Sequence, residues 1–131
     1  MVVGFYRCLL WMSLLFNLLG AINFKDTKVY RKAFGLSMEI FQLSKAFPKE
    51  ERYSLTNQMR SSSRSVCSNL AEAYRKRRYP AHFISKLTGC DGENSEIGLW
   101  LHYAFACEYM SAEAHQKLIE MKKRSVGCCI T

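Results

Sequence analysis

One helical seam runs almost unbroken along residues 83–108. Its positions alternate steps of four and three residues, which keeps them on one stripe of a helix with about 3.6 residues per turn. The seam consists of Phe83, Leu87, Cys90, Asn94, Ile97, Leu101, Ala104 and Glu108. This mostly apolar spacing is typical of a helix packed among other helices, with Asn94 as a polar residue that sets the register. Because Pro80 suits the first position of a helix, we predict a helix over residues 81–109.

Three other segments have helical periodicity. The spacing predicts helices over residues 27–47, 55–76 and 112–124, with Asp26, Ser54 and Ser111 as their N-caps. Pro48 separates the first helix from the second, because a residue that precedes proline disfavours the helical region. The chain has only 7 glycines and 2 prolines, which favours few long helices over many short strands. Residues 23–124 are therefore predicted to form an all-α, antiparallel, up-down-up-down four-helix bundle.

Two of these helices have more apolar surface than one core needs. The first carries a stripe of Val29, Ala33, Leu36, Ile40, Leu43 and Phe47. A second stripe of Tyr30, Phe34 and Phe41 lies about 120° around the same helix. Trp100 and Tyr103 also lie off the long seam. An additional apolar face needs another cover, so we expect a second buried surface and a homo-oligomer.

The two ends of the chain lie outside the predicted bundle. Residues 1–22 form an apolar extension that contains Arg7, and residues 125–131 form a C-terminal tail. Three interpretations of the extension remain open. It is a signal peptide or anchor, a start codon assigned too far upstream, or an additional helix.

The six cysteines have no spacing typical of a zinc site or a redox pair. Cys67, Cys90 and Cys107 fall inside helical patterns, where we expect small buried apolar side chains. This usage predicts a reduced, cytoplasmic protein, unless the N-terminal segment directs it to a membrane or out of the cell.

The positive charge is concentrated in one stretch. The chain has a net charge of +8, and residues 52–86 carry eight basic residues and a single acid, Glu72. The candidate nucleic-acid-binding residues are Arg60, Arg64, Arg75, Lys76, Arg77 and Arg78. Tyr74 and Tyr79 are candidates for stacking on bases. We expect Glu72 to pair with an arginine, and the serines at 61–63, 65 and 68 to permit close helix packing.

Four segments of the sequence resemble one known protein family. They are the segments 24–33 (FKDTKVYRKA), 47–56 (FPKEERYSLT), 64–78 (RSVCSNLAEAYRKRR) and 83–87 (FISKL). Together they resemble the bacterial four-helix-bundle proteins first met in intervening sequences of 23S ribosomal RNA genes. The resemblance covers about residues 23–120. It implies a left-handed bundle that assembles into a ring, with a pentamer expected, and no catalytic residues.

The same resemblance implies kinship with the accessory protein of diversity-generating retroelements. That relative uses a basic ring surface to bind nucleic acid and a reverse transcriptase. A reverse transcriptase is therefore an expected partner, beside RNA or DNA.

The sequence offers little support for an enzyme. A di-iron bundle needs Glu-x-x-His pairs, and His82, His102 and His115 follow Tyr79, Leu99 and Ala112 at that spacing. We therefore expect no metal, no cofactor and no small-molecule substrate. Arg77 and His82 match an Arg-x4-His spacing found in helical RNases, which leaves an RNase as a minor alternative.

The leading hypothesis is a non-enzymatic, oligomeric bundle that binds RNA or DNA. The main alternative is a protein-binding scaffold whose basic face meets an acidic partner.

Overall fold

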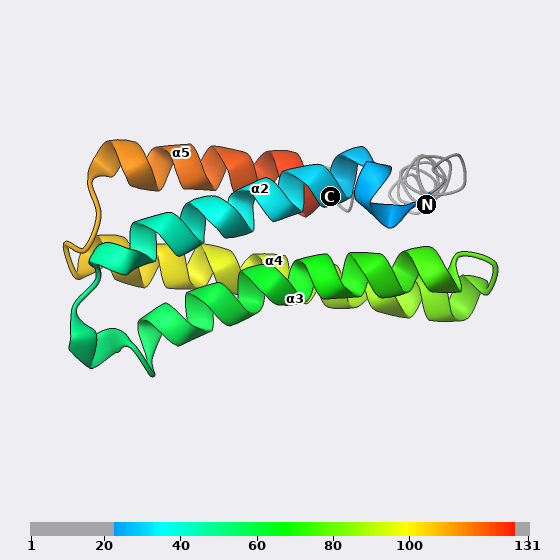
Figure 1. Ribbon diagram of the computed structural model, residues 1–131, viewed down its shortest axis with the longest axis horizontal. Coiled ribbons are helices and arrows are strands. Elements are labelled where there is room, and N and C mark those ends of the chain that lie inside the picture. Colours follow the sequence, from blue (N-terminus) through cyan, green and yellow to red (C-terminus); the bar gives the residue numbers. More distant parts are fainter. Residues whose placement is uncertain (1–22, 128–131) are drawn as a thin grey trace, which may run out of the picture.

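The computed structural model describes residues 23–127, and their regular secondary structure is entirely helical (Figure 1). Four α-helices follow one another: α2 (Lys28–Leu43), α3 (Leu55–Lys76), α4 (Pro80–Ala106) and α5 (Ala112–Lys122). Short helical turns join or extend them: η1 (Phe24–Asp26), η2 (Ser44–Ala46), η3 (Lys49–Glu51) and the π-helical η4 (Lys123–Gly127). The interpretations of residues 1–22 and most of the predicted tail lie outside the described residues.

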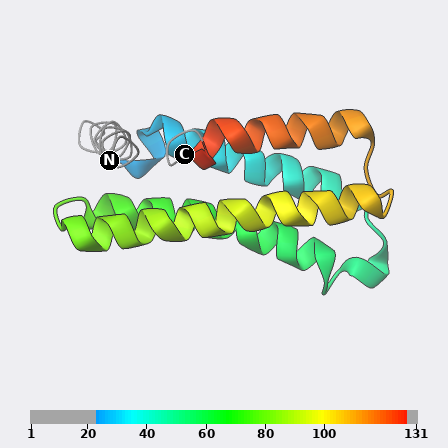
Figure 2. The same cartoon turned by 180° about the vertical axis from the view of Figure 1, so that it is seen from behind.

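The four helices lie along the long axis of the molecule, and successive helices run in opposite directions (Figures 1 and 2). The most extensive contact joins α3 to α4. Helix α2 packs on α3 and α5, and α5 packs on α4. As a result, η1, the end of α3 and the start of α4 share one end of the molecule, and the α2–α3 connection lies at the other.

The predicted seam forms the core side of α4. Its members from Phe83 to Ala104 are all buried, whereas Glu108 lies beyond the helix and is exposed. On α2, Val29, Ala33, Leu36 and Ile40 are buried as predicted. Off the seam, Trp100 is half-buried and Tyr103 is 52% exposed, so the described residues cover this aromatic surface only in part.

Helix α3 has the predicted bounds, and two of its serines are buried, one of them in contact with α4. Ser62 and Ser63 are 2% and 1% exposed, and the Ser62 hydroxyl lies 3.1 Å from a carboxylate oxygen of Glu96 on α4. Small side chains at a helix contact allow the backbones to approach closely. Ser61 and Ser68 are exposed, so the packing interpretation holds only for the serines that face the core.

The predicted cap of the first helix is wrong by one residue. Thr27, not Asp26, accepts a hydrogen bond from the Tyr30 N–H, at 3.3 Å. Asp26 belongs instead to η1, the turn that precedes the cap. The helix also ends earlier than predicted, because residues 44–46 tighten into η2.

The predicted N-cap of α3 is confirmed in position but not in its hydrogen bond. Ser54 occupies the N-cap position, but its side chain does not cap the helix. The Glu51 carboxylate accepts hydrogen bonds from the Leu55 N–H at 3.2 Å, from the Ser54 hydroxyl and from the Tyr109 hydroxyl at 3.1 Å. The hydrogen bonds from Ser54 and Leu55 lower the pKa of Glu51, because they stabilise its charged form.

Helix α4 stops three residues before its predicted end. Glu108 has a φ of 60°, which reverses the chain. The Tyr109 N–H then donates to the Ala104 carbonyl at 2.9 Å, a C-terminal capping bond. Cys107 consequently lies at the helix end and is exposed, so the prediction that it is buried was wrong.

Helix α5 begins as predicted, with the Ser111 hydroxyl accepting from the Ala114 N–H at 3.1 Å. Its helical path continues through η4, where Ser125 and Val126 are fully buried. Cys67 and Cys90 are buried, as predicted. No helix within residues 23–127 combines the length and apolar character needed to span a bilayer.

Candidate nucleic-acid interface

The six predicted cations lie in two groups along α3. Arg60 and Arg64 lie in its first half, whereas Arg75, Lys76, Arg77 and Arg78 surround its C-terminus. Arg77 is the C-cap and Arg78 lies beyond it, so neither belongs to the regular helix. Arg60 and Arg77 are half-buried, and the other four cations are exposed.

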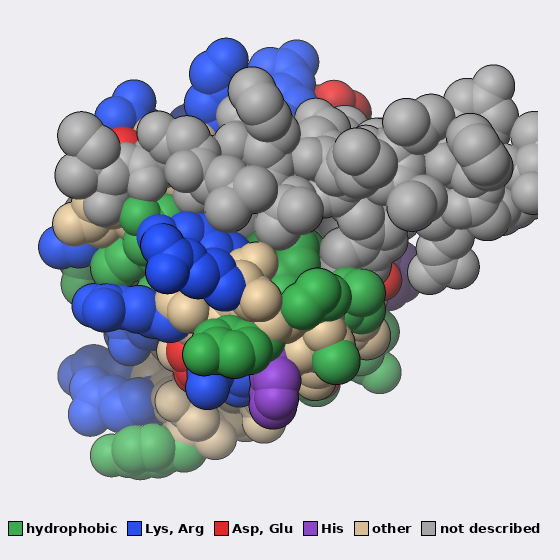
Figure 3. All heavy atoms as spheres, turned by 90° about the vertical axis from the view of Figure 1, so that its right-hand side faces the viewer, with side chains coloured by type: hydrophobic (Ala, Val, Ile, Leu, Met, Phe, Trp, Pro, Cys, Tyr) green, Lys and Arg blue, Asp and Glu red, His purple; other side chains and the backbone are tan. Residues whose placement is uncertain are grey.

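Cations from four elements, η1, α2, α3 and α4, and from the α3–α4 turn meet at one end of the molecule, here called the basic end. Its members are Lys25, Arg31, Arg75, Lys76, Arg77, Arg78 and Lys86. Figure 3 looks onto this end and shows Lys and Arg side chains over much of the surface that the grey residues leave in view. Such a concentration of positive charge attracts phosphate groups.

Aromatic contacts hold η1 against the end of α3. The Phe24 ring lies 6.4 Å from the Tyr74 ring, between centroids. On the other side, the Arg77 guanidinium lies 4.0 Å from the Tyr74 ring centroid, and its Nη1 donates to the Tyr74 carbonyl at 2.7 Å. Tyr74 is 7% exposed, so it packs in the structure and is not available for the stacking role considered above.

Tyr79 is placed differently from Tyr74. It lies in the turn between α3 and α4 and is 62% exposed. Its ring centroid is 6.3 Å from that of the exposed His82, with the two rings nearly perpendicular. This edge-to-face pair offers aromatic surface directly beside Arg78. Arg77 contacts Tyr74, and within the described residues no hydrogen bond joins it to His82.

The two acids at the basic end are paired. Glu72 binds Lys86 of α4 at 2.5 Å, which corrects the prediction of an arginine partner. Asp26 lies 3.7 Å from Arg31, between the carboxylate oxygen and the guanidinium nitrogen. Each acid therefore offsets one cation and leaves the arginines of the α3–α4 turn unopposed by an ion pair within residues 23–127.

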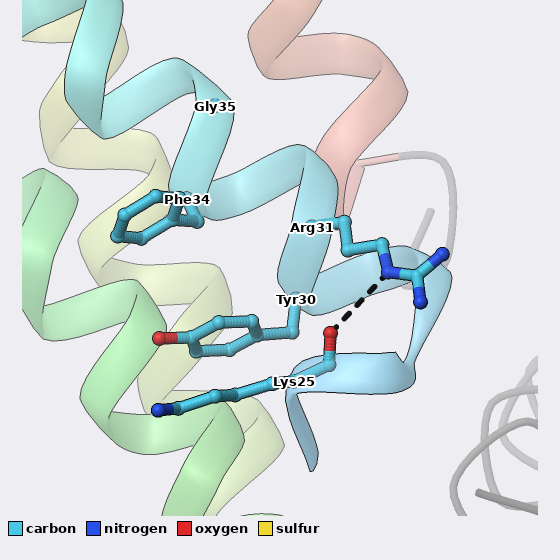
Figure 4. Close-up of a pocket in the computed structure, with 5 residues that line it drawn as sticks. All are labelled: Lys25, Tyr30, Arg31, Phe34 and Gly35. Atoms are coloured by element: carbon cyan, nitrogen blue, oxygen red, sulfur yellow. Dashed lines mark hydrogen bonds between the residues drawn. The ribbon is translucent and has the colours of Figure 1, made fainter. Parts of the chain in front are cut away.

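A groove of about 420 Å³ lies beside the basic end, lined by Lys25, Tyr30, Arg31, Phe34 and Gly35. In Figure 4, the side chains of Lys25, Tyr30 and Phe34 point to the same side of α2, and Arg31 points to the other. The Tyr30 and Phe34 rings are stacked, with centroids 6.1 Å apart. The pKa of Tyr30 is raised mainly by burial and to a lesser extent by the nearby Cys67. This hydroxyl therefore remains protonated at neutral pH.

Arg60 and Arg64 surround an aromatic ring that the sequence had assigned to subunit contact. Their guanidinium carbons lie 4.9 and 5.9 Å from the Phe41 ring centroid, and the Lys45 Nζ lies at 4.7 Å. Sequence reasoning missed Lys45 as part of this cluster. Its spacing of four residues from Phe41 was the available signal, because such residues are neighbours on a helix.

A comparison with known protein families identifies the family of this chain. The family model described as 23S rRNA-intervening sequence protein matches residues 25–126. The chain belongs to this family. All four α-helices lie within the match, and so do all members of the basic end. A search of curated proteins gives no match.

A second, apolar surface lies near the other end of the molecule. Leu55, Trp100, Tyr103 and Cys107 line a hollow of about 320 Å³ between the start of α3 and the end of α4, together with the polar residues Glu51, Ser54 and Gln58. Within residues 23–127, no three His, Cys, Asp or Glu side chains converge as a metal ion would require.

Proposed function

We propose that this protein is a non-enzymatic, oligomeric, up-down-up-down four-helix bundle that binds RNA or DNA through its basic end. The observation that carries the proposal is the convergence of cations on the α3–α4 turn, beside the exposed Tyr79 ring. The acids Asp26 and Glu72 are each engaged by a cation, so they do not neutralise Arg75, Lys76 and Arg78.

The residues divide the binding task between charge and stacking. Arg75, Lys76 and Arg78 are exposed and contact phosphates, whereas Arg77 chiefly holds the Tyr74 ring. Tyr79 stacks on an unpaired base. Phosphate contacts carry no sequence information, so binding is expected to show little sequence preference and to weaken steeply with salt.

Fluorescence anisotropy with a labelled single-stranded RNA and the matching DNA tests the proposal. The Arg75→Gln/Arg78→Gln double variant should bind at least about tenfold more weakly, and each lost phosphate contact should lower the salt slope by about 1. Lys117→Gln is the matched control, because Lys117 is an exposed cation paired with Glu39 on a different face. Equal affinities of the double variant and the wild type would refute the proposed interface.

The same samples test the absence of enzymatic activity. RNA should be recovered intact after long incubation with the wild-type protein. Cleavage that is abolished in both Arg77→Ala and His82→Ala would instead identify the RNase considered from the sequence.

The proposal also covers the oligomeric state and the protein partner. The family resemblance supports a pentameric ring and a reverse transcriptase as protein partner. Phe34 and Met38 of α2 are 49% and 40% exposed, which leaves apolar surface for a neighbouring subunit. Light scattering should give a mass of about five 15.2 kDa chains, and a monomer would contradict the ring.

A protein-binding scaffold remains the second candidate, favoured by the apolar hollow at Leu55, Trp100 and Tyr103. Pull-down with and without nuclease separates the two functions, because a nuclease-resistant protein partner would favour the scaffold. The free thiols Cys67, Cys90 and Cys107 favour a reducing compartment, consistent with action in the cytoplasm.

A further inference from the structure

The α2–α3 connection encloses a basic hollow at the end of the molecule opposite the basic end. This connector pocket has a volume of about 290 Å³. It is lined by Ser44, Lys45, Phe47, Pro48, Lys49, Arg52, Thr56 and Arg60. The lining combines η2, η3 and the first turns of α3, three segments that the chain brings together by reversing direction (Figure 1).

The charge lining this pocket has one sign. Lys45, Lys49, Arg52 and Arg60 are its four cations, and no acid contributes to the lining. None of the four forms an ion pair with a residue in the range 23–127. The neighbouring Glu51 carboxylate is occupied by Ser54, Leu55 and Tyr109 in the α3 cap.

One of the cations is held in place before any ligand arrives. The Arg60 Nε donates to the Ser44 hydroxyl at 2.8 Å, and that hydroxyl donates to the Phe41 carbonyl at 3.1 Å. Ser44 is 3% exposed, and the Arg60 guanidinium also lies against the Phe41 ring. The bond to Ser44 uses Nε and leaves the terminal nitrogens of Arg60 for a ligand.

We propose that the connector pocket binds a phosphate monoester, the dianionic terminal phosphate of a nucleotide or of a nucleic-acid 5′ end. A positioned guanidinium matches the oxygens of a phosphate group in a two-bond fork, and the lysines add compact point charges. A terminal phosphate carries about two charges at neutral pH and exposes three oxygens, whereas a backbone diester carries one charge. Four converging cations therefore suit the terminal group better than the backbone.

This site is separate from the proposed nucleic-acid interface. Arg60 and Arg75 are fifteen positions apart on α3, a distance of about 22 Å along the helix axis. Binding of a mononucleotide at the connector pocket does not depend on nucleic-acid binding at the basic end, so the two proposals can fail independently.

Calorimetric titration of the full chain tests the site with adenosine 5′-monophosphate and with adenosine. We expect the monophosphate to bind at least tenfold more tightly than adenosine. The Lys45→Gln/Arg52→Gln double variant should lose at least tenfold in affinity for the monophosphate; both residues are exposed, so the fold should tolerate the change. The Arg75→Gln/Arg78→Gln variant serves as the control and should bind the monophosphate as the wild type does.

A second arm identifies the source of the phosphate. A six-nucleotide RNA with a 5′-phosphate should bind more tightly than the same RNA with a 5′-hydroxyl, and the difference should vanish in the connector variant. Measured in the Arg75→Gln/Arg78→Gln background, which removes the proposed contacts at the basic end, an advantage of the phosphorylated RNA over the mononucleotide assigns the site to nucleic-acid ends, and equal affinity assigns it to free nucleotides. The proposal is overturned if the monophosphate and adenosine bind alike, or if the connector variant binds the monophosphate as tightly as the wild type.

Discussion

Gly89 of α4 faces Asn69 of α3 so closely that a β-carbon at position 89 would lie 3.2 Å from the Asn69 Oδ1. The Asn69 side chain is itself held, because its Nδ2 donates to the Ser65 carbonyl at 3.0 Å. Gly92, one turn further along α4, has no neighbouring atom within 4 Å of the same position. The two glycines therefore share a helix but not an environment.

This difference in environment predicts that a glycine-to-alanine substitution changes the free energy of unfolding differently at the two positions. Gly92→Ala should raise the free energy of unfolding by up to about 1 kcal/mol, because alanine favours a helix interior. Gly89→Ala should lose that gain, because the new methyl group displaces Asn69 from its bond to Ser65. Denaturant midpoints measured on both variants check the prediction, and equal stabilisation would contradict the close contact.

Glu108 predicts a stabilising substitution. It has a left-handed φ of 60°, a conformation that costs a residue with a β-carbon about 1 kcal/mol relative to glycine. Glu108→Gly should therefore raise the thermal midpoint. Glu113→Gly in the first turn of α5 is the control and should lower it, because glycine weakens a helix. A lower midpoint for Glu108→Gly would argue against the chain reversal at this residue.

Glu72 predicts a gain in nucleic-acid affinity. Glu72→Gln removes the acid at the α3–α4 end and frees Lys86, so RNA should bind more tightly, most clearly at low salt. The exposed pair contributes little to stability, so the free energy of unfolding should change by less than about 1 kcal/mol. Glu39→Gln, which breaks the Lys117 pair on another face, should leave the affinity nearly unchanged. Equal effects of the two substitutions would show that general charge, not the basic end, governs binding.

The cysteines predict selective thiol chemistry. Cys107 is exposed, so in the native protein iodoacetamide should modify it well before Cys67 and Cys90, as followed by peptide mass spectrometry. Rapid modification of Cys67 or Cys90 without denaturant would contradict their burial.

The burial of Cys67 and Cys90 also predicts that the protein becomes less stable at alkaline pH. Burial raises the pKa of Cys67 to about 11 and that of Cys90 to about 12, from an ordinary value of 9.0. A raised pKa means that the folded state favours the neutral thiol, so its contribution to stability is fully present below pH 9. That contribution should decline as the pH rises from 9 toward 12. Cys67→Ala/Cys90→Ala should flatten the decline relative to the wild type.

Local patterns were sufficient to predict the helices. The seam from Phe83 to Ala104 and the bounds of α3 follow from periodicity, two prolines and one turn, and all of these act within a few residues. The capping contact of α3 was predicted incorrectly because it depends on a longer contact. The Glu51 carboxylate that caps this helix also accepts from Tyr109, which lies 58 residues away.

The candidate sites required still more distant information. The six cations and their two groups along α3 were visible in the sequence, but not the further cations that other segments bring to each group. Those additions follow from η1 folding back onto Tyr74 and from the reversal that brings Lys45, Lys49 and Arg52 to Arg60. No periodicity within one helix encodes either contact.

The straight course of α3 sets a minimum size for any ligand that reaches both cationic regions. A nucleic acid must span about 22 Å to contact Arg60 and Arg75 together, which is about six steps of a strand that rises about 3.4 Å per nucleotide. Shorter ligands engage one region at a time, whereas longer ones gain avidity because the second contact becomes intramolecular. The proposed binding surfaces on α3 therefore predict that affinity increases with the length of the polynucleotide.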